Sequence, residues 1–198
     1  VNSLLRDLNF RVKFVDDLTT IECIPRSSLS MTPLLVNDIY EYALTRGMRL
    51  NPKKCKEMII NFLQYRLPFQ DTLQVGGNTI ERVSSYKLLG VYLQSELSWN
   101  LHCDYITKKA NKRLYILLIL RRVRIGYQQL VTVCCSLIRP ILEYAVAVWS
   151  AILDCFKAKV ERVQERAFKI IDPGLSYEES LQKSGLQTLT KRREEICK

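Results

Sequence analysis

Histidine is almost absent from this sequence of 198 residues, and the single copy is His102. The seven cysteines include no Cys-x-x-Cys pair. Structural zinc sites need closely spaced cysteine and histidine ligands, so the sequence argues against a zinc domain. An iron oxygenase site that uses two histidine ligands is excluded as well, because the sequence contains only one histidine. An odd number of cysteines without such pairing is typical of a protein from an intracellular, reducing compartment.

A long hydrophobic run without charge is also missing. The most apolar stretch, 130–149, contains Arg139, Pro140 and Glu143, which argues against a membrane span. No signal peptide opens the chain, which begins at Val1 inside a hydrophobic pattern and ends at Lys198 after a charged run. We therefore expect a fragment of a longer protein.

Acidic residues are few relative to basic ones, and the formal net charge is +10. Residues 1–98 contain 12 Lys/Arg and 10 Asp/Glu, whereas residues 99–198 contain 18 and 10, a net charge of +8. A basic surface of this kind binds nucleic-acid phosphates, because each neutralised phosphate releases counterions. Solubility, or an acidic protein partner, is the alternative explanation.

The first half has the pattern of a mixed α/β layer. Two β-prone segments, 9–15 and 18–24, predict a hairpin with an acidic pair between them. Apolar residues at helical spacing then predict a helix that starts near Pro33 and ends at Gly47. A further strand is predicted over 57–63. Segments 73–75 and 79–82 are predicted to form a hairpin whose turn is Gly76-Gly77-Asn78. The last predicted strand is 85–93, which Gly90 interrupts.

The second half has a helical pattern from Trp99 onward. Pro140 is expected to start or kink a helix, and Pro173-Gly174 to break one. The predicted helices are 99–122, 127–138, 139–152, 155–171, 177–184 and 188–197. The expected fold class is therefore α+β, with one domain over 1–97 and an all-α domain over 98–198.

Phe14-Val15-Asp16-Asp17 is the sharpest local feature. Adjacent carboxylates at a hairpin tip repel each other and lose hydration on burial, and a divalent cation relieves that cost. Mg²⁺ uses one or two protein carboxylates together with substrate phosphates, and a pair of such ions activates an attacking hydroxyl and stabilises the leaving group. A solvated Asp-Asp loop is the common alternative.

This tetrapeptide resembles motif C of reverse transcriptases, which has the form Tyr/Phe-x-Asp-Asp, and its phenylalanine is similar to the non-LTR class. Other segments resemble further parts of these enzymes in the same order. They are 1–4 (after motif B), 33–55 with Leu50-Asn51-Pro52-Lys53-Lys54-Cys55 (motif D), and 85–91 (motif E, the primer grip). The thumb is matched by 97–102, 108–114, 139–144 and Trp149, and the region after the thumb by 163–167 and 189–193. The chain thus resembles a reverse transcriptase of a non-LTR, LINE-type retrotransposon, of the Jockey- and RTE-like kind.

The resemblance implies a role for each matched position. Asp16 would be a direct ligand of the catalytic metals, and Asp17 an accessory ligand. Lys54 would protonate the leaving pyrophosphate or bind the incoming triphosphate, unless it lies in a solvated basic turn. The primer grip would comprise Leu89, Gly90 and Val91, where Gly90 either admits the primer backbone or simply forms a bulge.

Basic residues of the first thumb-like helix would track the template–primer backbone without reading bases. A solvated helix face is the alternative for all of them. These residues are Lys108, Lys109, Lys112, Arg113, Arg121 and Arg122.

The implied activity is RNA-directed DNA synthesis by two-metal nucleotidyl transfer. The complete enzyme would use two Mg²⁺ (or Mn²⁺) ions, an RNA template, a DNA primer and dNTP, and this fragment would hold no metal tightly. We expect it to be inactive alone, because motifs A and B would lie upstream of Val1. Two alternatives remain: a non-catalytic, basic nucleic-acid-binding remnant, and a helical interaction module similar to the N-terminal region of the alkylation-repair dioxygenase/tRNA-methyltransferase family.

Overall fold

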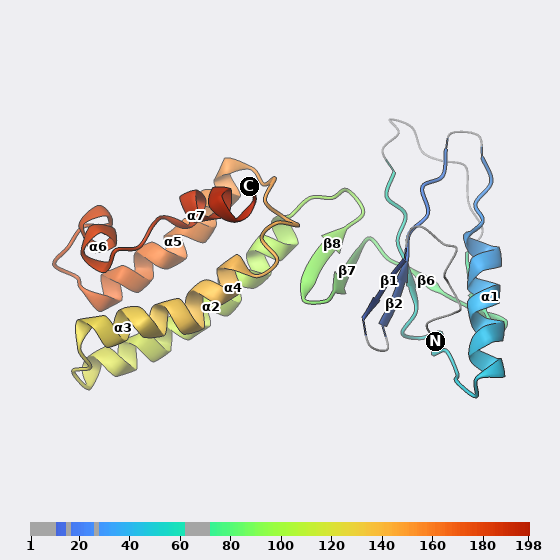
Figure 1. Ribbon diagram of the computed structural model, residues 1–198, viewed down its shortest axis with the longest axis horizontal. Coiled ribbons are helices and arrows are strands. Elements are labelled where there is room, and N and C mark those ends of the chain that lie inside the picture. The colour runs from blue at the N-terminus through green and yellow to red at the C-terminus, as the bar shows by residue number, and fades with distance from the viewer. Residues whose placement is uncertain (1–10, 15–16, 26–27, 62–71) are drawn as a thin grey trace. The chain divides into compact units, whose positions relative to one another are not determined.

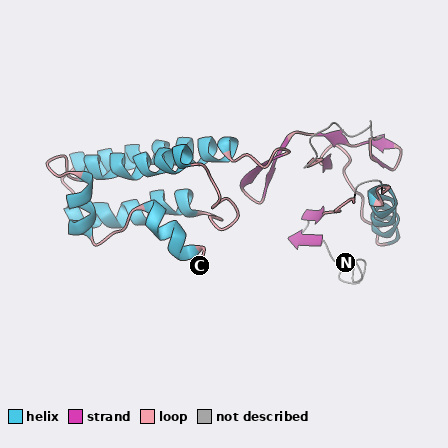
Figure 2. Cartoon of the chain, turned by 90° about the horizontal axis from the view of Figure 1, so that it is seen from above, coloured by secondary structure: helices cyan, strands magenta, loops and turns pink. Residues whose placement is uncertain are grey.

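The computed structural model describes residues 11–14, 17–25, 28–61 and 72–198. The chain divides into two compact units, Val1–Tyr86 and Lys87–Lys198, each of which is described by itself (Figure 1). Among the described residues, the strands all lie before the second helix, and every later element is helical (Figure 2). The expected α+β class is therefore confirmed.

The first unit opens with the predicted hairpin. β1 (Arg11–Phe14) pairs antiparallel with β2 (Asp17–Thr20), and the register places Phe14 opposite Asp17. Val15 and Asp16 lie outside the described residues.

Helix α1 (Thr32–Thr45) follows, with Pro33 in its first turn and buried Ile39 and Ala43 on its inner face. The start of α1 is held by a carboxylate from earlier in the chain. Glu22 accepts hydrogen bonds from the backbone nitrogens of Met31 (2.8 Å) and Thr32 (3.0 Å) and from the hydroxyl of Ser30 (2.7 Å). Burial raises the pKa of Glu22, but the hydrogen bonds from Thr32, Met31 and Ser30 outweigh it, so the pKa lies below its ordinary value.

α1 packs on a small hairpin. β4 (Gln74–Val75) and β5 (Asn78–Thr79) are joined by Gly76 and Gly77, both with positive φ, as the sequence predicts. A Cβ at Gly76 would lie 2.6 Å from the hydroxyl oxygen of Tyr40 on α1. Gly76 is thus required by both the turn and the packing.

Of the strand predicted over 57–63, only Glu57 lies in a strand among the described residues, and 62–63 lie outside them. β3 (Lys56–Glu57) pairs in parallel with β6 (Glu81–Arg82), and residues 58–61 are not in a strand. β6 supplies only two residues before the chain bends at Ser84, so the ladder ends there. Two ion pairs, Lys56 with Glu81 and Arg82 with Glu57, link the short strands.

The strand predicted over 85–93 is a hairpin. β7 (Ser85–Leu88), in which the boundary between the units falls, pairs with β8 (Val91–Gln94), and the two-residue turn consists of Leu89 (φ +45°) and Gly90 (φ +91°). Positive φ at both central residues is typical of the tight turns that join antiparallel strands. Gly90 therefore marks a reversal of the chain and not a bulge.

The rest of the second unit is helical, and its elements are α2 (Asn100–Arg122), α3 (Tyr127–Val133), the π-helical η1 (Cys134–Ile138), α4 (Arg139–Glu143), α5 (Asp154–Ile171), α6 (Tyr177–Ser184) and α7 (Leu189–Ile196). The helix predicted over 139–152 ends at Glu143, because Tyr144 is extended (ψ 127°) and Ala145 has φ +51°. The turns that follow bring Trp149 into the core, where its Nε1 donates to the carbonyl of Tyr144 (2.9 Å).

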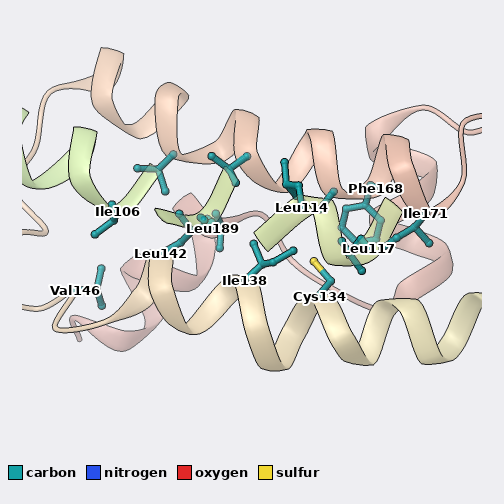
Figure 3. Packing of buried hydrophobic residues seen from close by; sticks show 14 of the residues in the cluster. Ile106, Leu114, Leu117, Cys134, Ile138, Leu142, Val146, Phe168, Ile171 and Leu189 are labelled. Atoms are coloured by element: carbon teal, nitrogen blue, oxygen red, sulfur yellow. The ribbon is translucent and has the colours of Figure 1, made fainter. Parts of the chain in front are cut away.

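The core of this unit lies between α2, α5 and the segment from α3 to α4 (Figure 3). Leu114 and Leu117 of α2 lie beside Phe168 and Ile171 of α5, whereas Ile106 lies at the other end of the cluster, on the side of Val146. Cys134, Ile138 and Leu142 close the cluster from the other side. None of the helices in the described part of the chain combines the length and hydropathy needed to cross a bilayer.

Candidate nucleic-acid interface

The acidic turn is described only in part. Asp17 is exposed at the first position of β2, whereas its neighbour Asp16 lies outside the described residues. No group of three or more His, Cys, Asp or Glu side chains suited to a metal occurs in the described segments. One carboxylate fits only part of a Mg²⁺ ligand set, which needs further oxygens from the protein, water or substrate.

Lys54 lies in a turn that Asn51 shapes. The carbonyl of Asn51 accepts from the backbone nitrogen of Lys54 (3.0 Å), and its side chain accepts from that of Lys53 (3.1 Å). Lys54 is exposed, and among the described residues its ammonium forms no ion pair. An exposed ammonium without an ion pair can bind an anionic ligand such as a triphosphate. It fits a solvated basic turn equally well.

The three primer-grip candidates have different environments at the β7–β8 turn. Leu89 is exposed, and its carbonyl accepts a hydrogen bond from the hydroxyl of Tyr144 (2.8 Å). A Cβ at Gly90 would lie 3.2 Å from Cε1 of the same ring. Val91 is buried. Gly90 therefore admits an aromatic ring of the protein against the turn, while the Val91 side chain faces inward.

Polar contacts fasten the hairpin to the start of α2. The backbone nitrogen of Tyr92 donates to Nδ1 of His102 (3.3 Å), and that of Leu101 donates to the side-chain oxygen of Gln94 (3.2 Å). Burial lowers the pKa of His102, which favours the neutral ring, and a neutral ring can accept this hydrogen bond at Nδ1. The sequence had offered no role for this single histidine.

Lys87 and Tyr105 form the outermost contact between the hairpin and α2. Nζ of Lys87 donates to the hydroxyl of Tyr105 (2.8 Å) and lies 4.3 Å from the centre of its ring. Nζ of Lys109 lies 5.9 Å from the same centre. The hydrogen bond from Lys87 lowers the pKa of Tyr105, and the same bond raises the pKa of Lys87.

A hollow of about 270 Å³ lies beside these contacts. Its walls are Gly90, Tyr105, Ile106, Lys109, Pro140, Ile141 and Tyr144. Of these, only Gly90 and Lys109 were predicted to belong to a site. The two tyrosines carry no motif, and their proximity depends on how α4 ends, so sequence spacing gave no sign of it.

The predicted basic face of α2, formed by Lys108, Lys109 and Lys112, consists of exposed side chains. Its opposite side supplies the buried residues Ile106, Ala110, Leu114 and Leu117. Six exposed cations of α2 were predicted to contact nucleic acid: Lys108, Lys109, Lys112, Arg113, Arg121 and Arg122. In the described part of the chain none of them forms an ion pair. Arg121 and Arg122 also lie in the last turn of α2, where cations stabilise the negative end of the helix dipole.

Comparison of this chain with protein-family models, with curated proteins and with solved structures found no match.

Proposed function

We propose that this chain is part of an RNA-directed DNA polymerase of a non-LTR retrotransposon, comprising a partial palm (1–97) and a helical thumb with the region after it (98–198). The observation that supports it most is the β7–β8 hairpin fastened to the start of α2, directly before the basic face of that helix. A hairpin that holds the primer and a helix that follows the duplex backbone would need this connection.

The charge and length of α2 support backbone binding. Lys108 to Arg122 span about 21 Å along a helix that rises 1.5 Å per residue, and the basic side chains at these positions are exposed. Phosphate contacts from lysine and arginine fix position on a duplex but carry no sequence information. The proposed ligand is therefore an RNA–DNA hybrid bound by its backbone.

In the parent enzyme, Asp16 and Asp17 would contribute ligands to two Mg²⁺ (or Mn²⁺) ions, and Lys54 would serve the triphosphate. The ions would activate the primer hydroxyl and stabilise the leaving pyrophosphate. Leu89, Gly90 and Val91 would support the primer end. Motifs A and B are not among the segments matched here, so these residues would form one part of the catalytic centre.

A salt titration of hybrid binding tests the proposal. We expect log Kobs to fall linearly with log[salt], with a slope of about 0.9 per neutralised phosphate for B-DNA, and of similar size for a hybrid. Changing Lys108 and Lys112 together to Gln should reduce the slope by about two such increments. The matched control changes Lys169 on α5 and Lys191 on α7 together to Gln, since both lysines are exposed. Binding that ignores salt, or a control that loses as much as the double variant, would contradict the proposal.

A non-catalytic nucleic-acid-binding protein is the second candidate. The observation that favours it is that the cations of α2 lack ion pairs among the described residues. An Asp16→Ala change in the longer parent distinguishes the two. If synthesis is lost while hybrid binding persists, the polymerase is supported. If the parent never synthesises DNA, the second candidate stands.

A further inference from the structure

The hollow beside the β7–β8 turn combines three kinds of surface. Tyr105 and Tyr144 present aromatic rings, Ile106 and Ile141 are aliphatic, and Lys109 carries a positive charge. A nucleotide has matching parts: a flat apolar ring system and an anionic phosphate. Bases bind to proteins without sequence preference by stacking on aromatic side chains beside cations that track the backbone.

The size of the hollow limits its occupant. At about 270 Å³ it is just below the range of roughly 300–1,000 Å³ typical of sites for drug-sized ligands. A stacked duplex end is too large to enter, whereas one unpaired base is a single ring system. Among the parts of a nucleic acid, a base that has left the stack therefore fits this volume.

The charges beside the hollow suit one phosphate. Nζ of Lys87 and Nζ of Lys109 lie 4.3 and 5.9 Å from the centre of the Tyr105 ring, so two ammonium groups border the same phenol. The hydrogen bond from Lys87 to the Tyr105 hydroxyl fixes that ring before any ligand binds. A phosphate attached to a base in the hollow would therefore meet Lys109 in its wall, and Lys87 borders the same Tyr105 ring.

Tyr144 is fixed in a similar way. Its hydroxyl donates to the carbonyl of Leu89 (2.8 Å), and its ring lies against Gly90, where a Cβ would be only 3.2 Å away. Preorganised aromatic side chains lose little freedom on binding, which favours affinity. Tyr144 is nevertheless 53% exposed as a residue, and it forms part of the wall of the hollow.

We infer that this hollow binds one unpaired nucleotide of a nucleic-acid strand, with the base against Tyr105 and Tyr144 and its phosphate on Lys87 and Lys109. The inference rests on the proposed function, because the hybrid on the basic face would deliver the strand. It adds to that function a site that distinguishes a strand carrying an unpaired terminal nucleotide from a flush duplex end.

The experiment uses the 198-residue chain and an RNA–DNA hybrid whose DNA strand ends in one unpaired 2-aminopurine, a base whose fluorescence falls when it stacks. We expect quenching on binding, and about tenfold tighter binding than for the blunt hybrid, which is one base stack on an aromatic side chain. Tyr105→Leu should abolish both effects, while Tyr105→Phe should keep the quenching. Tyr115→Leu, a change at an exposed tyrosine of the same helix outside the hollow, should leave both effects intact.

Three outcomes separate the two ideas. Equal, salt-dependent binding of both hybrids without quenching would overturn the nucleotide site and leave the proposed function standing. Quenching that survives Tyr105→Leu would also overturn it.

If no hybrid binds, the proposed function fails, and 2-aminopurine riboside monophosphate alone then tests the hollow. Its quenching, sensitive to Tyr105→Leu and Lys109→Gln but not to Lys169→Gln, would support the site, and no quenching would overturn it.

Discussion

Both the backbone conformation and the packing at position 90 favour glycine, and the change Gly90→Ala tests both. Its φ of +91° disfavours any side chain, and a Cβ would lie 3.2 Å from the ring of Tyr144. Gly185 has a comparable positive φ of +68° with nothing within 4 Å of its missing Cβ. Gly185→Ala should therefore cost only the backbone term, about 1–2 kcal/mol, whereas Gly90→Ala should cost more.

Chemical denaturation of the two variants measures the difference in the free energy of unfolding of the second unit. Equal losses would show that the Tyr144 ring does not press on the turn. Gly90→Ala combined with Tyr144→Leu should recover the excess, because the smaller side chain leaves room for the methyl group.

Glu22 is the residue on which the start of α1 depends. Its pKa is lowered in the folded chain, so it stabilises the fold above its unfolded pKa of about 4.3 and loses this effect as the pH falls through the folded value. Glu22→Gln should cost about 0.5–2 kcal/mol at neutral pH, as for loss of a helix cap, and should remove the acid dependence. Hydrogen exchange of the α1 amides measures this.

The control for Glu22 is Glu41→Gln, at an exposed position of α1. That change should leave exchange in α1 nearly unaltered. An acid dependence of α1 protection that persists in Glu22→Gln would assign the effect to another carboxylate.

At the scale of elements, α2 separates a packing face from a binding face. Leu117 is fully buried in the cluster shared with α5, whereas Ile119 is 40% exposed. Leu117→Ala should destabilise the second unit by about 2–5 kcal/mol, and Ile119→Ala by much less. Thermal unfolding followed by circular dichroism ranks the two, and similar losses would contradict the assignment of the faces.

The helices were predictable because their signals are local. Pro33 and Gly47 bracket α1, and the apolar spacing of α2 and α5 continues over several turns. The short turn at Leu89 and Gly90 was missed, since one glycine in an apolar segment fits a bulge as well as a reversal. The end of α4 was missed too, because the extended Tyr144 depends on the burial of Trp149.

In the candidate site, too, the features that depend on local spacing were predictable, and those that depend on contacts between distant residues were not. Lys108, Lys109 and Lys112 share one face of α2, so their common exposure could be predicted from spacing alone. The contact between Tyr144 and the β7–β8 turn joins distant parts of the chain, and no sequence period encodes it. The roles of Asp16, Asp17 and Lys54 stay predictions based on resemblance.

For the whole molecule, the proposed function predicts binding without synthesis. The purified chain should give no template- and Mg²⁺-dependent dNTP incorporation, because the segments that resemble the proposed enzyme do not include motifs A and B. A primer-extension assay on an RNA template measures this, with an intact reverse transcriptase as the positive control. Incorporation above background that disappears in Asp16→Ala would contradict the prediction and would place a complete active centre in these 198 residues.

The ring of Tyr144 against Gly90 also has an evolutionary consequence. Any descendant of this gene that acquires a side chain at position 90 meets the ring 3.2 Å away. Such a lineage should replace the aromatic residue at position 144 in compensation, and one that keeps the aromatic should keep glycine. The two positions are therefore expected to covary as a pair, although 53 residues lie between them in the sequence.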